Sequence, residues 1–159
     1  MAFVIFNIGS NMGSRRLFLS RAVRMLAERF GDFELSHVVE SDPVGFDSTR
    51  SFLNLCMAVN TDLPPEEILD IAKEIETEIS FVPHRTPDGG YADREIDIDI
   101  IAIDSLELST PTLTIPHPRM AERRFVLEPL QEIAPGWVHP VLKLTPLEML
   151  AALPDEREE

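Results

Sequence analysis

The segment from Arg94 to Ile103 constrains the fold more than any other part of the sequence. It reads Arg-Glu-Ile-Asp-Ile-Asp-Ile-Ile-Ala-Ile, with isoleucine at positions 96, 98 and 100 and aspartate at positions 97 and 99. Because successive side chains of a β-strand point to opposite faces, this alternation predicts a strand over residues 94–103 with its isoleucines in a core. Asp97 and Asp99 then share the other face, about 6.6 Å apart at roughly 3.3 Å per residue.

Two neighbouring carboxylates on one face repel each other unless a positive charge lies between them. Magnesium prefers oxygen ligands and is usually held by one or two carboxylates together with substrate phosphates. Asp97 and Asp99 therefore predict a magnesium site. The alternative is an ordinary strand with a solvated acidic face.

The rest of the chain supplies the neighbours of this strand. Apolar, β-branched runs predict strands over residues 2–8, 33–40 and 51–61. Helical periodicity predicts one helix from a Ser14 cap to about residue 30, and another that opens at Pro64 and Pro65. The order strand, helix, strand, strand, helix, strand is the ferredoxin-like βαββαβ pattern of the α+β class, an antiparallel sheet with helices packed on one face. Helices over residues 119–133 and 145–152 follow as C-terminal additions, and we expect a single domain over residues 1–159.

Composition excludes several classes of function. The formal net charge of −14 disfavours a nucleic-acid partner, because such proteins gain affinity by neutralising phosphates with Lys and Arg. No apolar stretch approaches the roughly 20 residues that span a bilayer, and the N-terminus lacks the basic region of a signal peptide. We therefore expect a cytoplasmic protein without membrane contacts, and a monomer is the default expectation. Cys56 is the only cysteine, which excludes an internal disulfide, and its apolar neighbours predict a core position.

Basic residues gather after the predicted magnesium strand. His117 lies between Pro116 and Pro118, and Arg119, Arg123 and Arg124 follow it. Guanidinium groups bind phosphate oxygens with two parallel hydrogen bonds, so this group suits a polyphosphate. A surface helix start with solvated arginines is the alternative.

Two further features indicate a small-molecule site. Phe52 and Asn54 share one face of the strand over residues 51–61, where an aromatic ring and an amide are able to hold a flat heterocycle, although a plain core position for Phe52 is the alternative. Residues 81–93 form a long connection of the kind that often serves as a lid or binding loop.

Several short segments follow one another in a characteristic order and spacing over roughly residues 3–140. They are Ile8-Gly-Ser-Asn11, Pro43-Val-Gly45, Phe52-Leu-Asn54, Ile75-Glu76, Arg94-Glu-Ile-Asp-Ile-Asp99, Ile115-Pro-His-Pro-Arg-Met120, Arg123-Arg-Phe-Val-Leu127 and Ile133-Ala-Pro135. Together they resemble the 6-hydroxymethyl-7,8-dihydropterin pyrophosphokinase family of folate synthesis.

The resemblance implies that ATP donates its terminal diphosphate to the pterin hydroxymethyl oxygen and that AMP is released. It implies two Mg²⁺ ions at Asp97 and Asp99, and a stacking role for Phe125 on one face of the pterin while Asn54 contacts the polar edge of the ring. The catalytic residues that it implies are Arg94, Asp97, Asp99 and Arg123. The ATP contacts that it implies are Arg94, Ile100, Thr114, His117, Arg123 and Arg85. The pterin contacts that it implies are Ser41, Asp42, Val44, Phe52, Asn54, Tyr91 and Phe125.

The predicted lid departs from the family pattern. Members of the family commonly carry a Gly-Arg-x-Arg run and an Arg-Trp-Gly-Pro-Arg run, where this chain has Ser80-Phe-Val-Pro-His-Arg85 and Gly90-Tyr-Ala-Asp-Arg94. Two alternatives therefore stay open: an inactive or re-targeted family member, and a ferredoxin-like regulatory module that binds a small ligand without chemistry. We expect the loops over residues 42–50 and 81–93 to move when substrates bind.

Overall fold

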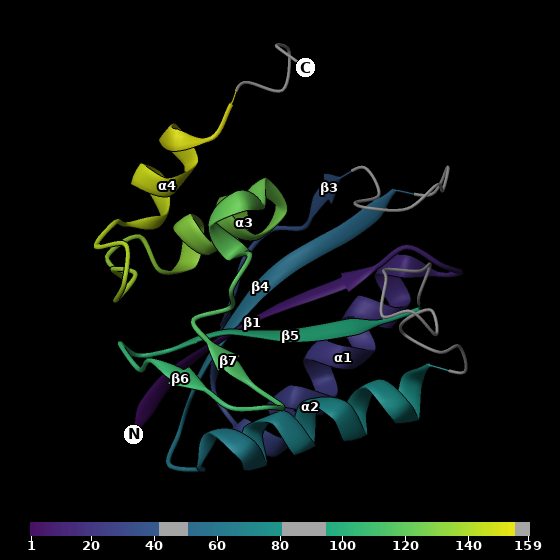
Figure 1. Cartoon of the computed structure of the whole chain (residues 1–159). Coiled ribbons are helices and arrows are strands. Elements are labelled where there is room, and N and C mark those ends of the chain that lie inside the picture. Colours follow the sequence, from purple (N-terminus) through teal and green to yellow (C-terminus); the bar gives the residue numbers. More distant parts are fainter. Residues whose placement is uncertain (42–50, 81–94, 155–159) are drawn as a thin grey trace.

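A five-stranded antiparallel sheet forms the centre of the computed structural model, which describes residues 1–41, 51–80 and 95–154 (Figure 1). The strands are β1 Ala2–Ser10, β2 Phe33–Leu35, β3 Val39–Ser41, β4 Phe52–Thr61 and β5 Asp97–Ile103. Their order is β2-β4-β1-β5, and β3 pairs with β4 beyond the end of β2. This arrangement confirms the predicted ferredoxin-like sheet.

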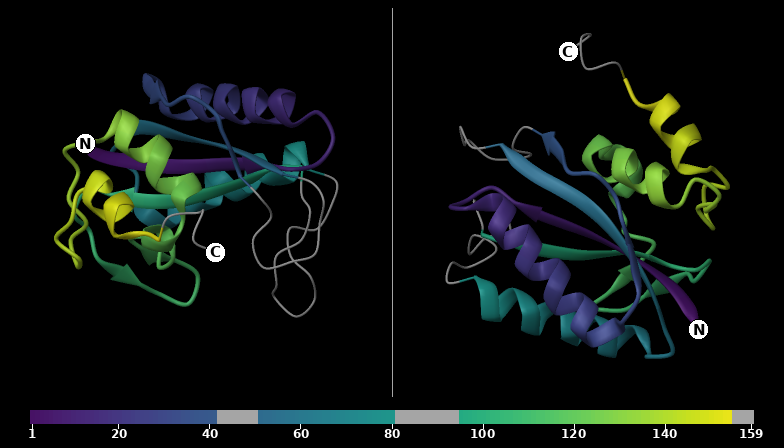
Figure 2. Two further views of the ribbon diagram at one scale, coloured as in Figure 1. Left: turned by 90° about the horizontal axis from the view of Figure 1, so that it is seen from above. Right: turned by 180° about the vertical axis from the view of Figure 1, so that it is seen from behind.

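Helices cover both faces of the sheet (Figures 1 and 2). On the first face, α1 Arg15–Phe30 and α2 Pro65–Ile79 pack on side chains such as Val4, Phe6 and Ile8. On the second face, α3 Arg124–Ile133 and α4 Pro146–Ala152 pack on a separate cluster that includes Ile5, Cys56 and Ala102. The prediction that helices pack on one face thus describes α1 and α2, while the C-terminal helices pack on the opposite side.

A β-bulge interrupts the pairing of β5 with β1. Phe6 lies opposite Ile100 and Ile5 lies opposite Ala102, so Ile101 is the extra residue. Before the bulge, Ile98 and Ile100 enter the core under α1 and α2, whereas Ile101 and Ala102 both enter the core under α3. A bulge shifts the side-chain alternation by one position, and here it lets β5 serve both cores.

The predicted strand over residues 33–40 is wrong as one element, because it is divided into β2 and β3. Between them, the Oγ of Ser36 accepts a hydrogen bond from the backbone N–H of Cys56 at 2.9 Å. The backbone N–H of His37 donates to the Glu132 carboxylate at 2.8 Å. The backbone N–H of Ser36 still donates to the Cys56 carbonyl at 3.0 Å, but the Ser36 hydroxyl and the Glu132 carboxylate replace backbone acceptors on either side of it. Both Cys56 and Glu132 are distant in sequence.

The predicted helix over residues 119–133 is also divided, into a 3₁₀ turn, η1 Met120–Glu122, and α3. Arg123 separates them with an extended backbone, φ −116° and ψ 103°, and its carbonyl accepts the N–H groups of Val126 and Leu127. Ser14 does precede α1, but its side chain makes no capping hydrogen bond.

A short hairpin, β6 Leu108–Ser109 and β7 Thr114–Ile115, lies beside β5. The backbone N–H of His117 donates to the carbonyl of Ile101 at 2.9 Å, so the bulged residue of β5 also anchors the chain that leaves β7. Within the described ranges, none of the helices has the length and apolar character needed to cross a bilayer.

Candidate active site

The candidate site lies on the second face of the sheet, where two rows of residues cross the neighbouring strands β5, β1 and β4. In the first row Asp97 on β5 lies opposite Gly9 on β1, which lies opposite Asn54 on β4. In the second row Asp99 lies opposite Asn7, which lies opposite Cys56. Both aspartates are half-buried. The predicted acidic face therefore points away from α1 and α2 and toward the side that α3 covers in part.

A side chain of α2 binds the backbone between Asp97 and Asp99. Glu76 accepts a hydrogen bond from the backbone N–H of Ile98 at 2.6 Å. A charged acceptor makes a hydrogen bond shorter and stronger than a neutral one does. Glu76 therefore fixes the residue that separates Asp97 from Asp99. Glu76 is not among the predicted site residues, although it belongs to the Ile75-Glu76 segment of the family resemblance.

Gly9 makes room for the side chain of Asn54. A Cβ atom built on Gly9 would lie 2.6 Å from the Oδ1 atom of Asn54, closer than two such atoms approach in practice. Asn54 is buried, and its Nδ2 donates to the Oγ of Ser41 at 3.3 Å. Because a buried amide needs partners, this bond sets the plane in which Asn54 presents its carbonyl oxygen.

Three of the predicted pterin contacts come together at this end of the sheet. Ser41 on β3 lies opposite Phe52 on β4, and Asn54 follows on the same face as Phe52. Several other predicted site residues lie outside the described part of the chain: Asp42, Val44, Arg85, Tyr91 and Arg94.

The start of α3 brings Arg123 and Phe125 to the same face. The Arg123 guanidinium carbon lies 5.6 Å from the centroid of the Phe125 ring, and Arg123 is only 7% exposed. A guanidinium within about 6 Å of a ring face is attracted to it, so each side chain restricts the other. Asn7 donates from Nδ2 to the Phe125 carbonyl at 3.4 Å, which ties this turn to the row of Asp99.

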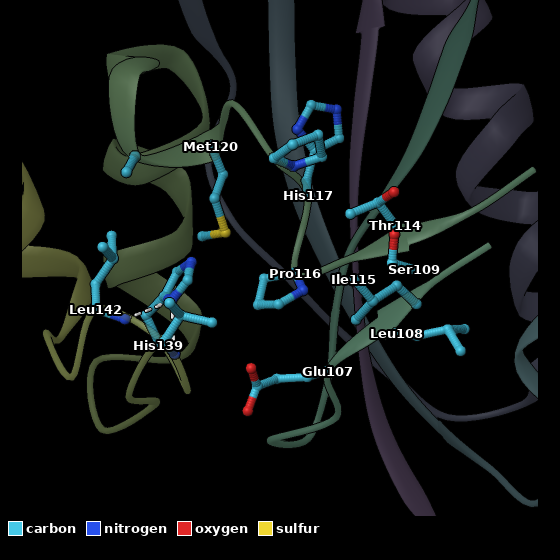
Figure 3. A pocket seen from close by; sticks show the side chains of 13 residues that line it. Glu107, Leu108, Ser109, Thr114, Ile115, Pro116, His117, Met120, His139 and Leu142 are labelled. Atoms are coloured by element: carbon cyan, nitrogen blue, oxygen red, sulfur yellow. Dashed lines mark hydrogen bonds between the residues drawn. The ribbon is translucent and has the colours of Figure 1, made fainter. Parts of the chain in front are cut away.

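His117 and Thr114 line an open pocket with a volume of about 470 Å³ beside the aspartate strand (Figure 3). The pocket lies between the β6–β7 hairpin, η1 and the turn that carries His139 and Leu142. The Nδ1 of His117 accepts the backbone N–H of Arg119 at 3.2 Å. The neutral imidazole therefore carries its proton on Nε2, which is the nitrogen that is able to donate to a ligand.

His139 forms the far wall of this pocket. Its Nδ1 accepts the backbone N–H groups of Val141 and Leu142 at 3.2 and 3.1 Å. Burial lowers the pKa of His139 below its ordinary value, because the charged imidazolium loses contact with water. Both the burial and the two hydrogen bonds at Nδ1 favour the neutral form of His139, which shapes the turn.

Ile100 stands apart from the other predicted ATP contacts. Its side chain is 4% exposed and belongs to the core under α1 and α2, on the opposite face from Asp97 and Asp99. A ligand on the second face therefore has access only to the backbone of Ile100.

The carboxylates of Asp97 and Asp99 fit a magnesium ion that completes its coordination with a substrate. Within residues 1–41, 51–80 and 95–154, no three His, Cys, Asp or Glu side chains converge as a metal cage. Structural zinc requires four protein ligands, whereas magnesium is usually held by one or two carboxylates, waters and substrate phosphates. Two half-buried carboxylates on a face that also holds Arg123 match the second pattern.

Sequence reasoning missed Asn7 and Gly9 as well as Glu76. An asparagine inside the apolar run Phe3-Val-Ile-Phe-Asn-Ile8 was a signal for a specific role, because a buried amide requires partners. No local pattern marks Gly9 as a site residue, because its role follows from its pairing with Asn54 on β4.

The comparisons with known proteins agree on one family. The family model for 7,8-dihydro-6-hydroxymethylpterin-pyrophosphokinase (HPPK) matches residues 5–135. The 2-amino-4-hydroxy-6-hydroxymethyldihydropteridine pyrophosphokinase of Porphyromonas gingivalis is 42% identical over 142 residues, which cover 88% of this chain and 95% of that protein. The Bacillus subtilis protein of the same name is 38% identical over 128 residues, which cover 79% of this chain and 74% of that protein.

Solved structures show the same fold at low sequence identity. A crystal structure of an HPPK-DHPS in complex with substrates superposes with a TM-score of 0.72 at 15% identity, covering 95% of this chain and 43% of that one. Plasmodium falciparum HPPK-DHPS with pteroate gives 0.72 at 16% identity, covering 94% of this chain and 42% of that one. This chain thus spans less than half the length of those chains. From the family match and the identity to these two relatives, the chain belongs to the 7,8-dihydro-6-hydroxymethylpterin-pyrophosphokinase family.

Proposed function

We propose that this protein transfers diphosphate from ATP to the hydroxymethyl group of 6-hydroxymethyl-7,8-dihydropterin and releases AMP, as a cytoplasmic monomer in folate biosynthesis. The observation that carries the proposal is the shared face of the sheet. Asp97 and Asp99 lie there with Asn54 on the same sheet row as Asp97, and Arg123 and Phe125 begin the helix that covers the adjoining part of that face.

The pterin occupies the part of this face near Phe52, Asn54 and Ser41. A pterin ring presents donors and acceptors along one edge, and an asparagine amide offers both. Because Ser41 already accepts a hydrogen bond from Nδ2 of Asn54, the amide is oriented before the ligand arrives. The aromatic rings of Phe52 and Phe125 supply flat apolar surfaces for stacking. Asp42, Val44 and Tyr91 stay predicted pterin contacts.

ATP lies on the other side of the aspartates, toward His117 and Thr114. The neutral imidazole of His117 offers an N–H donor to a phosphate oxygen, and Thr114 offers a hydroxyl in a pocket large enough for part of a nucleotide. Arg123 is buried and held against Phe125, so its guanidinium is already desolvated. Arg85, Arg94 and the backbone of Ile100 stay predicted ATP contacts.

Transfer of a diphosphate requires little covalent help from a protein, and it depends on positioning and charge neutralisation. Two Mg²⁺ ions held by Asp97 and Asp99 would neutralise phosphate charge and make the hydroxyl more acidic when bound. The residues of the pterin side hold the hydroxymethyl oxygen in line with the β-phosphorus. Arg123 stabilises the negative charge that develops on the oxygen leaving with AMP.

The test is release of AMP from ATP in the presence of magnesium and 6-hydroxymethyl-7,8-dihydropterin. We expect Asp97→Asn and Asp99→Asn each to lower the rate by roughly 10²–10³-fold, the usual loss when one electrostatic contact to a transition state is removed. Pterin binding, followed by its fluorescence, should persist in both variants. Asp70→Asn, at an exposed position on α2, is the matched control and should keep wild-type activity.

The alternatives give different results in this assay. An inactive or re-targeted family member, or a module that only binds ligands, releases no more AMP than the metal-free control. That result would overturn the proposed reaction. Light scattering during gel filtration, with an expected mass of one chain, tests the proposed monomer.

A further inference from the structure

Helix α3 contains a proline at a position that leaves one backbone carbonyl without its usual donor. In an α-helix, the N–H of each residue donates to the carbonyl four residues earlier. Pro129 lies inside α3 and has no N–H, so the carbonyl of Phe125 cannot receive this bond. A carbonyl in a largely buried place requires another donor, because an unpaired buried polar group costs free energy comparable to a lost hydrogen bond.

The donor comes from the sheet beneath the helix. The side-chain Nδ2 of Asn7 on β1 donates to the carbonyl of Phe125 at 3.4 Å. Asn7 is 4% exposed, and its amide also reaches the Sγ of Cys56 at 3.7 Å. Cys56 in turn donates from Sγ to the next carbonyl along α3, that of Val126, at 3.7 Å. Asn7 and Cys56, neighbours in the second row of the sheet, thus hold the first turn of α3 through two hydrogen bonds.

This contact joins two parts of the site that are far apart in sequence. Asn7 lies directly opposite Asp99 on β5, and Phe125 carries the ring against which the Arg123 guanidinium packs. A shift of the first turn of α3 would move the Phe125 ring and Arg123 relative to the aspartates. The place of this turn therefore depends on an amide that the sheet supplies.

We propose that Asn7 is a positioning residue of the active site, whose side-chain amide replaces the N–H that Pro129 lacks and thereby fixes the Phe125 ring relative to Asp99. The inference rests on the proposed function only in taking Phe125 as a pterin contact. It assigns no contact between Asn7 and a substrate.

A double-mutant cycle tests the proposal, because Pro129→Ala returns an N–H that is able to donate to the Phe125 carbonyl. We measure the KM for the pterin, the KM for ATP and kcat in wild type, Asn7→Ala, Pro129→Ala and the double variant. In the wild-type background, Asn7→Ala should raise the pterin KM about fivefold, the size expected for one hydrogen bond, and change the ATP KM less. In the Pro129→Ala background, the same substitution should change the pterin KM less than about twofold.

The control is Cys56→Ala in the same two backgrounds. Cys56 donates to Val126, whose carbonyl has the N–H of Leu130 at its helical position, so the effect of Cys56→Ala should not depend on residue 129. If Asn7→Ala leaves too little folded protein, Asn7→Leu replaces it, since leucine has a similar volume and no donor.

The outcomes separate the inference from the proposed reaction. An effect of Asn7→Ala on the pterin KM that is equal in both backgrounds overturns the inference. A cycle in the free energy of unfolding is measured on the same four proteins. Coupling there without coupling in the pterin KM also overturns the positioning role, because the bond would then be only structural. Failure of the proposed reaction appears separately, as wild-type protein that releases no AMP.

Discussion

Gly9 and Asn54 lie opposite each other on β1 and β4, and the absence of a side chain on Gly9 is what admits the Asn54 amide. A Cβ at Gly9 would meet Oδ1 of Asn54 at 2.6 Å and force the amide to turn. We expect Gly9→Ala to raise the pterin KM by roughly tenfold or more, because a misdirected polar group loses its hydrogen bonds to the ligand. Steady-state kinetics with varied pterin measure this effect.

Gly136→Ala is the matched control for this substitution. A Cβ on Gly136 would have no other atom within 4 Å, so the same chemical change should leave the pterin KM unchanged. An unchanged pterin KM in Gly9→Ala would show that Asn54 does not contact the pterin.

Glu76→Ala should lower kcat by about tenfold while changing both KM values little. The substitution removes the acceptor for the backbone N–H of Ile98, and the aspartates on either side lose a fixed separation. Leaving a largely buried N–H unpaired should also cost about 1–3 kcal/mol of the free energy of unfolding. Glu74→Ala removes an exposed carboxylate from the same helix, paired with Arg29, and should change neither quantity by much. A Glu76→Ala enzyme with wild-type kcat would contradict the positioning of the aspartates by α2.

The stability of the protein should fall as the pH drops below about 4.5, partly because of Glu132. The backbone N–H of His37 first, and the His37 ring second, lower the pKa of Glu132 from its ordinary value of 4.5. A carboxylate whose pKa is lower in the folded state stabilises the fold above its unfolded pKa. That contribution is lost as the pH falls through the folded value. Denaturant unfolding between pH 3 and 6, at intervals of about half a unit, measures the effect.

Two variants divide this pH dependence between its causes. Glu132→Gln should remove the contribution altogether. His37→Ala keeps the backbone N–H, which is the larger cause, and should retain most of it. An equal loss in both variants would show that the His37 ring, rather than its backbone, holds Glu132.

Cys56 should resist thiol reagents while the protein is folded. Burial raises the pKa of the Cys56 thiol to about 12, and only the thiolate is strongly nucleophilic. We expect no alkylation by iodoacetamide at pH 8 in the time that a free thiol needs for complete reaction, and rapid reaction in guanidinium chloride. Mass spectrometry gives both results, and fast modification of the native protein would mean that the contact between α3 and β4 opens readily.

The sequence patterns predicted the fold well where the signal was local. The alternation in β5, the apolar run of β4 and the stripe of α2 each predict their element, and together they define the sheet. The division of residues 33–40 could not be predicted this way, because it depends on Glu132 and Cys56, which are distant in sequence. The break at Arg123 likewise has no glycine or proline at its position to mark it, although its backbone is extended and its side chain is buried.

The sequence predicts the charged and aromatic members of the candidate site but not the residues that support them. Asp97, Arg123 and Asn54 carry recognisable chemistry. Gly9 and Asn7 act through the residues that lie opposite them, Asn54 on β4 and Asp99 on β5. The register that pairs these residues cannot be predicted from the sequence of β1 alone. Glu76 is a helix residue whose role comes from accepting one backbone N–H, that of Ile98 on β5, which its own sequence neighbours do not predict.

Because of the bulge at Ile101, the number of residues in β5 determines which face of the sheet each of its side chains occupies. Ile98 and Ile100 before it lie in the core under α1 and α2, whereas Ile101 and Ala102 lie in the core under α3, and Asp97 and Asp99 share the face opposite Ile98 and Ile100. Removing one residue between Asp99 and Ala102 would shift the alternation of side chains by one position. Either the two aspartates would point into the core under α1 and α2, or Ala102 and Ile103 would exchange the cores that they enter. In homologous sequences, the apolar residues between Asp99 and Ala102 should therefore vary in identity, but their number should stay the same.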